Sequence, residues 1–476
     1  MAEGDLETFC LGVANTLMLE RMSSPPGDLV PPGDVDEPST DSEFGSQIPA
    51  GYTYFGQLID HDITFDPASD LQRRNDSNRL PNFRTPRLDL DCVYGRGPAD
   101  QPYLYDTEDP AMPAGDSPIR FLIGRSADAN LRDLPRNGQR RALIGDMRND
   151  ENAVVCQLQL AFLLAHNTLV QRALDNGEAE PFLAAQQTLR WLYQWIVWHD
   201  FLGRVVDTQI HDAALTQTTA PGGRVVWERG LKDLFDWKYQ PFMPVEFSVA
   251  AYRFGHSMVR NSYQTNNPHR GFQVFAPIFD NTPGASGDDL RGFRPLVKTN
   301  AIQWDWFLQM TTSAGPFPQH ARRIDTRLAN ALAFLHEGAP GSPMNVLASR
   351  NLLRGIQFEL PSGPDVARKL GLTPVALGEG EPAALWYYVL KEAADPSGAA
   401  GQRLGPVGSF IVAAVFSGLL HGDPRSWLNV APAWTPDQDP LLQPGTDNVD
   451  DPQWGLPALI RLAGLPVDDG DVTAQS

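Results

Sequence analysis

The most informative stretch of this chain is Phe55-Gly56-Gln57-Leu58-Ile59-Asp60-His61-Asp62-Ile63-Thr64, which is predicted to be helical. Residues four apart share one face of a helix, so Gln57 and His61 would point into the same space. Packing rarely needs a histidine that has an amide one turn away and carboxylates, from Asp60 and Asp62, on both flanks. The segment therefore suggests the proton-handling side of a peroxide site; the alternative is a capped surface helix with an incidental histidine.

Outside this stretch, apolar residues recur at helical spacing over much of the chain, whereas the alternation typical of strands is scarce. The helices expected from this periodicity are 154–174, 183–206, 244–260, 324–336, 364–371, 382–394 and 406–421. We therefore predict a mainly α fold, built as a single large helical domain with long irregular loops. Glycine and proline, 41 residues each, support long connections between the helices.

Composition divides the chain into three parts. Residues 1–50 are rich in Pro, Gly, Asp and Ser, and we expect them to form an N-terminal arm. Residues 51–435 carry the helical periodicity and form the expected catalytic domain. Residues 436–476 are acidic and proline-rich, and we expect them to form a C-terminal tail packed on the surface.

Charge and hydropathy exclude several classes of partner. The formal net charge is −20 at pH 7, and a phosphate backbone or an anionic membrane repels such a surface. The longest apolar window, 407–420, is shorter than a membrane span and contains glycine and serine. We therefore expect no nucleic-acid partner and no membrane span.

Two features bear on the compartment. Cys10, Cys92 and Cys156 are too few for a disulfide framework, although Cys10 and Cys92 could pair. The N-terminus lacks the basic and apolar regions of a signal peptide. We expect a cytoplasmic or non-classically secreted protein, although a chain that had lost its leader would read the same.

A second segment with chemical character is Ala251-Tyr252-Arg253-Phe254-Gly255-His256-Ser257. His256 has apolar neighbours, and Gly255 removes side-chain bulk beside it, which is the clearance that a flat macrocycle needs next to its axial ligand. Neutral imidazole is a standard proximal ligand of haem iron. The alternative is a core histidine bonded to a carbonyl group.

A third segment, Gly145-Asp146-Met147-Arg148-Asn149-Asp150-Glu151-Asn152, precedes the helix expected from residue 154. Arg148 stays charged at any working pH and could stabilise the negative charge that develops when an O–O bond breaks. Glu151 lies one turn on and could face the same cavity. An N-terminal helix cap is the alternative, and it accounts for the acidic residues better than for Arg148.

A fourth segment places Asn351 and Arg354 three positions apart in a predicted helix. An asparagine can accept the Nδ1 proton of a ligand histidine and so fix its tautomer. An arginine suits a haem propionate, a carboxylate that it can grip with two bonds. A solvated polar helix face is the alternative.

A fifth segment, Thr85-Pro86-Arg87-Leu88-Asp89-Leu90-Asp91, offers oxygen ligands at alternate positions. They are a hydroxyl, the Arg87 carbonyl and two carboxylates, and Asp62 could add another carboxylate. Ca²⁺ takes six to eight such oxygens. The spacing is not that of an EF-hand, and an ordinary acidic loop is the alternative.

These five segments occur in the order found in the animal-type haem peroxidases, and the chain resembles that family. The stretches Ala161-Phe162-Leu163-Leu164-Ala165-His166-Asn167 and Leu404-Gly405-Pro406-Val407-Gly408 are similar to further family landmarks. The likeness spans roughly residues 50–425. It implies a helical domain around a buried haem.

The resemblance implies a role for each residue of the two histidine segments and their partners. His61 matches the distal histidine, Gln57 the distal glutamine and Arg148 the catalytic arginine. His256 matches the proximal iron ligand, and Asn351 matches its hydrogen-bond partner.

The resemblance also implies the contacts of two cofactors, haem and Ca²⁺. Arg253 and Arg354 match arginines near the haem edge and propionates. Asp60 and Glu151 match carboxylates that form ester bonds to haem methyl groups, so a covalently attached haem b derivative is expected. The residues that match the calcium ligands are Asp62, Thr85, Arg87 (through its carbonyl), Asp89 and Asp91. Asn152 stands where myeloperoxidase, a member of the family, has a methionine, so no sulfonium link is expected.

The activity implied by the resemblance is that of a haem peroxidase. Such an enzyme reduces hydrogen peroxide and, via compound I, oxidises halide, thiocyanate or small aromatic donors. One departure is that Gly355-Ile356-Gln357-Phe358-Glu359 follows Arg354, where the family usually continues with Arg, Asp and His. With the missing signal peptide and the scarce cysteines, this departure points to a bacterial-type member.

Two other functions are alternatives to this one. A fatty-acid dioxygenase of the same superfamily needs a radical-forming tyrosine three residues before the proximal ligand. Arg253 occupies that position, and Tyr252 is displaced by one residue, about 100° around a helix. A catalytically silent adhesion or scaffold protein would not need the complete set of Gln57, His61 and Arg148.

Overall fold

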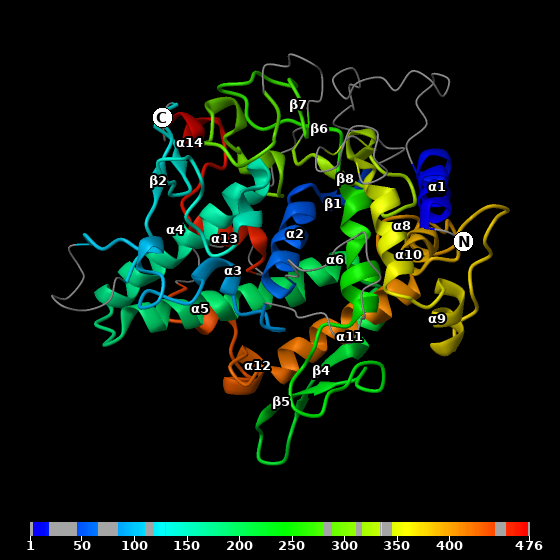
Figure 1. Ribbon diagram of the computed structural model, residues 1–476. Helices are drawn as coiled ribbons and strands as arrows, with labels where there is room; N and C mark the ends of the chain where they lie inside the picture. Colours follow the sequence, from blue (N-terminus) through cyan, green and yellow to red (C-terminus); the bar gives the residue numbers. More distant parts are fainter. Residues whose placement is uncertain are drawn as a thin grey trace.

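Helices and the irregular segments between them make up the described fold (Figure 1). The computed structural model describes residues 3–18, 45–64, 84–109, 119–128, 130–279, 288–310, 317–333, 335, 345–442 and 454–474. The α-helices are α1 (Glu3–Val13), α2 (Gly51–Ile63), α3 (Asp91–Tyr94), α4 (Ala153–Asp175), α5 (Pro181–Trp195), α6 (Gly203–Val205), α7 (Thr208–Ala214), α8 (Leu347–Gln357), α9 (Gly363–Lys369), α10 (Leu385–Ala393), α11 (Pro406–Gly422), α12 (Trp427–Val430), α13 (Leu456–Leu462) and α14 (Asp469–Ala474).

Short π-helices and 3₁₀ turns extend or connect these α-helices. The π-helices are η1 (Ala14–Met18), η5 (Ile196–Leu202) and η6 (Glu246–Ala250). The 3₁₀ turns are η3 (Pro102–Leu104), η4 (Met147–Asp150), η7 (Ala251–Met258), η8 (Lys298–Asn300), η9 (Trp304–Trp306), η10 (Asn330–Ala333) and η12 (Pro436–Gln438).

Strands are short and pair two by two, all antiparallel, in the part of the chain that the structure describes. The pairs are β1 (Gly45–Pro49) with β8 (His320–Arg322), β2 (Gly124–Arg125) with β3 (Arg132–Asp133), β4 (Leu215–Thr219) with β5 (Val225–Arg229), and β6 (Ser262–Tyr263) with β7 (Ala276–Pro277). The prediction of a mainly α fold is confirmed.

Helix α4 belongs to the core and packs against α5, α2 and α13 (Figure 1). Its apolar residues occur on every side, and Leu158, Phe162 and Leu169 are fully buried. Each such side chain stabilises the fold by about 2 kcal/mol. Among the described helices, α4 is long and apolar enough to cross a membrane, but 83% of that apolar stretch is buried inside the molecule, as in a core helix.

Backbone hydrogen bonds fix both ends of helix α2. At its start, the Gly51 amide donates to the Phe307 carbonyl at 2.8 Å. A Cβ at Gly51 would lie 2.8 Å from that carbonyl oxygen, so the close approach requires glycine. At its end, Thr64 turns extended while its amide still donates to the Asp60 carbonyl. The helix therefore presents Gln57 and His61 from a fixed position.

Two predicted helices differ from the structure. Residues 324–336 form only the short turn η10 among the described positions, so that prediction is wrong. The reason is that their amides bond elsewhere: Ile324 to the Gly401 carbonyl and Leu328 to the Met18 carbonyl. Residues 244–260 are helical, but they form η6 followed by η7, with an irregular backbone at Ala250 between them.

The two ends of the chain contribute to the core. Near the N-terminus, α1 packs against α8, and Cys10 is fully buried; positions 19–44 of the expected arm lie outside the described residues. Near the C-terminus, α13 packs on α4, with Leu456 and Ile460 fully buried. The expectation of a surface tail over 436–476 therefore differs from the structure at α13, because these apolar residues complete the core.

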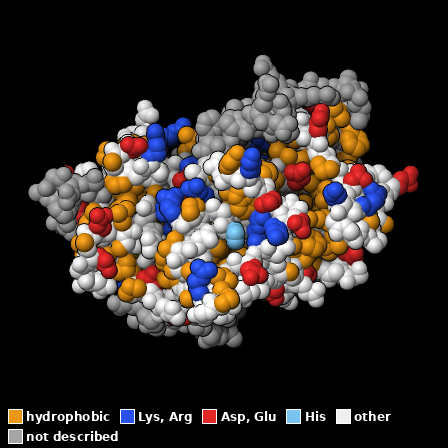
Figure 2. Space-filling model, turned by 90° about the horizontal axis from the view of Figure 1, so that it is seen from below, with side chains coloured by type: hydrophobic (Ala, Val, Ile, Leu, Met, Phe, Trp, Pro, Cys, Tyr) orange, Lys and Arg blue, Asp and Glu red, His pale blue; other side chains and the backbone are white. Residues whose placement is uncertain are grey.

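The distribution of surface charge and the state of the cysteines can be compared with the sequence analysis. Figure 2 shows acidic and basic side chains interspersed on the face seen from below, so the negative charge is not gathered into one patch there. Cys10, Cys92 and Cys156 are all buried and free, so the pairing considered for Cys10 and Cys92 does not occur.

Candidate active site

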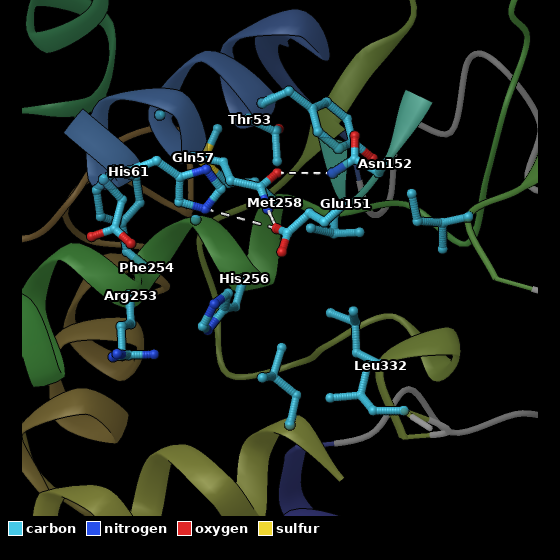
Figure 3. A pocket seen from close by; sticks show the side chains of 18 of the residues that line it. Thr53, Gln57, His61, Glu151, Asn152, Arg253, Phe254, His256, Met258 and Leu332 are labelled. Atoms are coloured by element: carbon cyan, nitrogen blue, oxygen red, sulfur yellow. Dashed lines mark hydrogen bonds and ion pairs between the residues drawn. The ribbon is translucent and has the colours of Figure 1, made fainter. Parts of the chain in front are cut away.

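One cavity of about 550 Å³ brings together most of the chemically notable residues (Figure 3). Its walls come from α2, η7 and α8, together with residues 151–152, 278–279 and 291–293. His61 projects into it from α2, and His256 projects into it from η7 on the opposite side. The structure therefore brings together two imidazoles that are 195 positions apart in the sequence, numbered 61 and 256.

His61 is held by a buried amide. Its Nδ1 lies 2.7 Å from Asn149 Oδ1, and Asn149 Nδ2 donates to Gln159 Oε1 at 2.7 Å. An oxygen acceptor at Nδ1 keeps the ring proton on that nitrogen and leaves Nε2 bare. Nε2 lies 3.8 Å from Glu151 Oε1 at the cavity wall. The ring is thereby prepared to accept a proton from a molecule inside the cavity.

The electrostatic setting keeps His61 neutral. Burial lowers its pKa to about 4, and the nearby Arg148 guanidinium lowers it as well; the carboxylates of Asp60 and Asp146 act in the opposite direction. At neutral pH the imidazole is therefore uncharged and available as a base.

Gln57 also has its amide held at both ends. Its Oε1 accepts a hydrogen bond from Asn152 Nδ2 at 3.1 Å, and its Nε2 donates to Glu151 Oε1 (Figure 3). Asn152 is in turn the N-cap of α4, because its Oδ1 accepts from the amides of Val154 and Val155. Gln57 therefore lies on the same side of the cavity as His61, with a defined orientation.

Arg148 is not among the residues that line the cavity. Its Nη2 donates to the carbonyls of His61 (3.0 Å) and Thr64 (2.6 Å) and to Asp146 Oδ2 (2.8 Å). Burial raises the pKa of Asp146, but the bonds and charges of Arg148 and Arg84 outweigh it and lower that pKa to about 2. Arg148 therefore satisfies carbonyls at the end of α2, which the helix itself leaves without partners.

His256 faces the cavity from the opposite wall. Its Nδ1 lies 2.9 Å from Asn351 Nδ2, while Asn351 Oδ1 lies 3.4 Å from Arg253 Nη1. Burial lowers the pKa of His256 to about 3, and the charges of Arg253 and Arg350 add to that effect, so the imidazole is neutral. A metal-binding Nε2 would require the amide oxygen of Asn351 at Nδ1, which a 180° rotation of this nearly isosteric group provides.

Charged side chains ring the cavity. Asp60 and Glu151 both line it, and Asp60 Oδ1 accepts from Thr64 Oγ1 at 2.9 Å. Arg253 and Arg354 line it as well, together with Arg350, which lies next to Asn351 in α8. The two carboxylates and the arginines expected to meet a haem thus all reach the same space.

Several observations of the cavity fit a haem. A side chain at Gly255, beside His256, would meet no atom within 4 Å, so there is open space next to the imidazole. Thr53 Oγ1 is buried in the cavity wall and has no hydrogen-bond partner among the described residues. The remaining wall is apolar and includes Phe279, Leu332, Leu335 and Leu347.

A second cluster lies at the end of α2, away from the cavity. Ligand atoms of Asp62, Asp89 and Asp91 all lie within 4.8 Å of one another, and Thr85 Oγ1 donates to Asp89 Oδ2 at 2.9 Å. Burial raises the pKa of all three carboxyls, that of Asp91 to about 7. Asp89 Oδ1 accepts no hydrogen bond from the described residues.

The chemistry of this second cluster fits a hard cation. Buried carboxylates that repel one another are costly unless a positive charge joins them. Arg84 supplies part of that charge, since its Nη1 lies 3.2 Å from Asp91 Oδ1 and its Nη2 bonds Asp146. Of the five expected calcium ligands, the structure brings together the four side chains, those of Asp62, Thr85, Asp89 and Asp91.

Sequence reasoning missed Asn149 and the cap function of Asn152. Asn149 contacts His61 across 88 positions and Asn152 contacts Gln57 across 95, and an asparagine beside an expected helix start is ordinary. The one available signal was position, because both residues lie in the segment that also holds Arg148 and Glu151.

Comparisons with known proteins agree with this geometry. The sequence model of the animal haem peroxidase family matches residues 72–375, a range that includes Arg148, His256 and Asn351 and begins after α2. A peroxidase-like protein from Margaritifera margaritifera is 32% identical over 133 residues, which is 26% of this chain and only 15% of that protein.

Solved structures of similar fold are distant in sequence. Peroxidase A from Dictyostelium discoideum is 14% identical with a TM-score of 0.57, covering 88% of this chain and 83% of that one. The fatty acid alpha-dioxygenase of Oryza sativa is 15% identical with a TM-score of 0.60, covering 98% and 79%. At such identities the likeness shows the fold alone.

Proposed function

The chain belongs to the animal haem peroxidase family, and on that basis we propose that it reduces hydrogen peroxide and oxidises halide, thiocyanate or small aromatic donors. The observation that carries the proposal is the placement of two neutral imidazoles, that of His61 buried and that of His256 partly buried, on opposite walls of one cavity. We further propose residues 51–435 as the catalytic domain. Titration with hydrogen peroxide, followed in the visible spectrum, tests the activity and excludes a silent scaffold if the spectrum changes.

The proposed mechanism assigns proton transfer to His61. When bound, haem supplies an iron centre that takes up peroxide oxygen and accepts two oxidising equivalents. His61 Nε2 takes the proton of the bound peroxide and returns it to the departing oxygen, acting as base and then as acid. Asn149 holds the required tautomer through Nδ1. Arg148 keeps the end of α2 in place and adds positive charge behind His61.

His256 would hold the iron, with Asn351 fixing its ring, and Arg253 and Arg354 would bind the propionates. Support comes from the position of His256, Arg253 and Arg354 in the cavity wall and from the contact between Asn351 and His256 Nδ1. Gln57 would place a water molecule or a halide on the side of the cavity that His61 occupies.

Asp60 and Glu151 are proposed to attach the haem covalently. Each carboxylate oxygen would replace one hydrogen of a ring methyl group, a two-electron oxidation for which hydrogen peroxide is the acceptor and water the product. After exposure to peroxide, haem should stay with the protein during acid–organic extraction. A variant carrying both Asp60→Ala and Glu151→Ala should release essentially all of its haem into the organic phase.

The unexposed wild-type protein is the control for this extraction, since it should release its haem before peroxide is added. Haem that extracts freely from peroxide-treated wild type would contradict the ester links while leaving the peroxidase proposal intact.

We propose Ca²⁺ for the cluster of Asp62, Asp89, Asp91 and Thr85, with Arg87 contributing its carbonyl. Strong chelation should release about one Ca²⁺ per chain. Removal should also lower the free energy of unfolding by about 3 kcal/mol when Ca²⁺ had been present at a hundred times its dissociation constant. Binding should weaken as the pH falls, because protons compete for carboxyls whose pKa is raised. Metal analysis and thermal melting measure these effects.

The matched control is Asp62→Asn, which keeps the shape of the side chain but removes a charged ligand. It should bind Ca²⁺ weakly and show little further change on chelation. Absence of calcium from the wild-type protein, by elemental analysis, would contradict this site.

One observation favours a second candidate function, that of a fatty-acid dioxygenase. Tyr252 is buried, lines the cavity and donates through its hydroxyl to the Gly56 carbonyl at 3.2 Å. A tyrosine at the cavity is what radical attack on a fatty acid would need. Oxygen uptake with linoleate, lost in Tyr252→Phe, would support this function; its absence favours the peroxidase.

A further inference from the structure

The orientation of the Asn152 side chain is determined by a helix end. Its Oδ1 accepts hydrogen bonds from the backbone amides of Val154 at 3.1 Å and Val155 at 2.9 Å. Backbone amides can only donate, so the oxygen must face α4 and the amide nitrogen must face away from it. Asn152 is 5% exposed, so water does not compete with these bonds.

The orientation of Asn152 determines the orientation of Gln57. Asn152 Nδ2 lies 3.1 Å from Gln57 Oε1, so that oxygen is turned toward Asn152 and the start of α4 (Figure 3). The Gln57 NH₂ group is then turned the other way, where one N–H donates to Glu151 Oε1. His61 Nε2 lies 3.8 Å from the same Glu151 oxygen, so the NH₂ group of Gln57 and the bare nitrogen of His61 meet at one point of the cavity wall.

A glutamine amide that lacked this contact could present either its oxygen or its NH₂ group to the cavity, because the two ends have nearly the same shape. The two presentations have opposite electrostatic effects. An N–H attracts anions and lone pairs, whereas a carbonyl oxygen repels them. The neighbouring charges are the Glu151 carboxylate, 3.8 Å from His61 Nε2, and the Asp60 carboxylate in the same wall.

We propose that Asn152 is a positioning residue that turns the N–H groups of Gln57 into the cavity and so favours anionic over neutral electron donors. The inference rests on the proposed peroxidase function, because it concerns the donor class used at that same site. The covalent link proposed for Glu151 would strengthen the effect, since an ester carries no negative charge.

Two variants separate this role from helix capping. Asn152→Asp and Asn152→Ser both keep an oxygen that can cap α4. The aspartate places a second oxygen against Gln57 Oε1 and should reverse the amide. The serine is too short to reach Gln57 and adds no charge, so it should leave the amide free to adopt both orientations.

The measurement is a spectral titration of the ferric haem protein with thiocyanate, compared with turnover of a neutral phenol. For Asn152→Asp we expect the dissociation constant of thiocyanate to rise about tenfold, the effect of one hydrogen bond, with a rise of about threefold for Asn152→Ser. Phenol turnover should fall by less than the affinity for thiocyanate, and the melting temperature should stay near wild type. In a Gln57→Leu background, Asn152→Ser should have no effect on thiocyanate, and Asn152→Asp should retain only the effect of its charge.

Unchanged thiocyanate affinity in both single variants would overturn the inference, and so would equal losses for thiocyanate and phenol. An effect of Asn152→Ser that persists without the Gln57 amide would also overturn it. The thiocyanate titration requires bound haem but no turnover. If peroxide leaves the wild-type spectrum unchanged, that result contradicts the proposed peroxidase function, but the titration still tests the role of Asn152.

Discussion

His61→Ala is expected to slow the reaction with hydrogen peroxide by roughly a thousandfold, within the 10²–10⁴ range of general acid–base catalysis, while haem content stays the same. The reason is that Nε2 is the bare ring nitrogen facing the cavity, and no other neutral base among the described residues lies on that wall. Stopped-flow absorbance after mixing with peroxide measures the rate, and the haem-to-protein ratio measures binding.

His166 offers a matched control on α4. It is fully buried, and burial lowers its pKa to about 4, as it does for His61. Both of its nitrogens have partners, however: Nδ1 lies 3.0 Å from the Tyr94 hydroxyl and Nε2 lies 3.0 Å from the Ile119 carbonyl. His166→Gln should lower stability and leave the peroxide rate unchanged. An unchanged rate in His61→Ala would remove that residue from the mechanism.

Loss of a residue that only contacts an iron ligand weakens metal binding by roughly 10–100-fold. His256→Gly is expected to weaken haem binding by more than that, because it removes the proposed bond to iron itself. The deletion leaves space beside Gly255, which already borders open volume. Free imidazole should enter that space and restore both the visible spectrum and the reaction with peroxide. Titration of the haem-free protein, before any exposure to peroxide, gives the affinity.

Asn351→Ala is the comparison for this second experiment. It leaves the proposed ligand in place and removes only the contact at Nδ1, so it should fall within the 10–100-fold range and gain nothing from added imidazole. If His256→Gly keeps the wild-type spectrum and rate, then the iron is bound elsewhere and the assignment of the proximal side is wrong.

Much of the helical fold could be predicted from apolar periodicity, because long buried helices carry a strong signal. The expected helix at 154–174 is α4, and the expected helix at 406–421 is α11. The segment 324–336 has a similar pattern, but its amides bond to Met18, Asn261 and Gly401, which are distant in sequence. Such tertiary bonds leave no local signal, so the prediction failed there.

In the candidate site, too, some residues could be predicted from the sequence and others could not. The titratable residues stood out because a histidine between two carboxylates is unusual in a packing role. The amides of Asn149 and Asn152 did not stand out, since an asparagine near a helix start has an ordinary explanation. The contacts of Arg148 with the carbonyls at the end of α2 depend on how two distant segments dock, which no spacing in the sequence encodes.

A line of alternating charges joins the acidic cluster to the end of α2. Arg84 bonds both Asp91 and Asp146, and Asp146 bonds Arg148, which holds the His61 carbonyl. Two sites joined in this way share a coupling free energy, and such a coupling is reciprocal. Whatever factor a Ca²⁺ ion at the acidic cluster adds to ligand affinity in the cavity beside His61, a ligand in that cavity must add to Ca²⁺ affinity. Measuring either affinity with the other site full and empty therefore gives the same number.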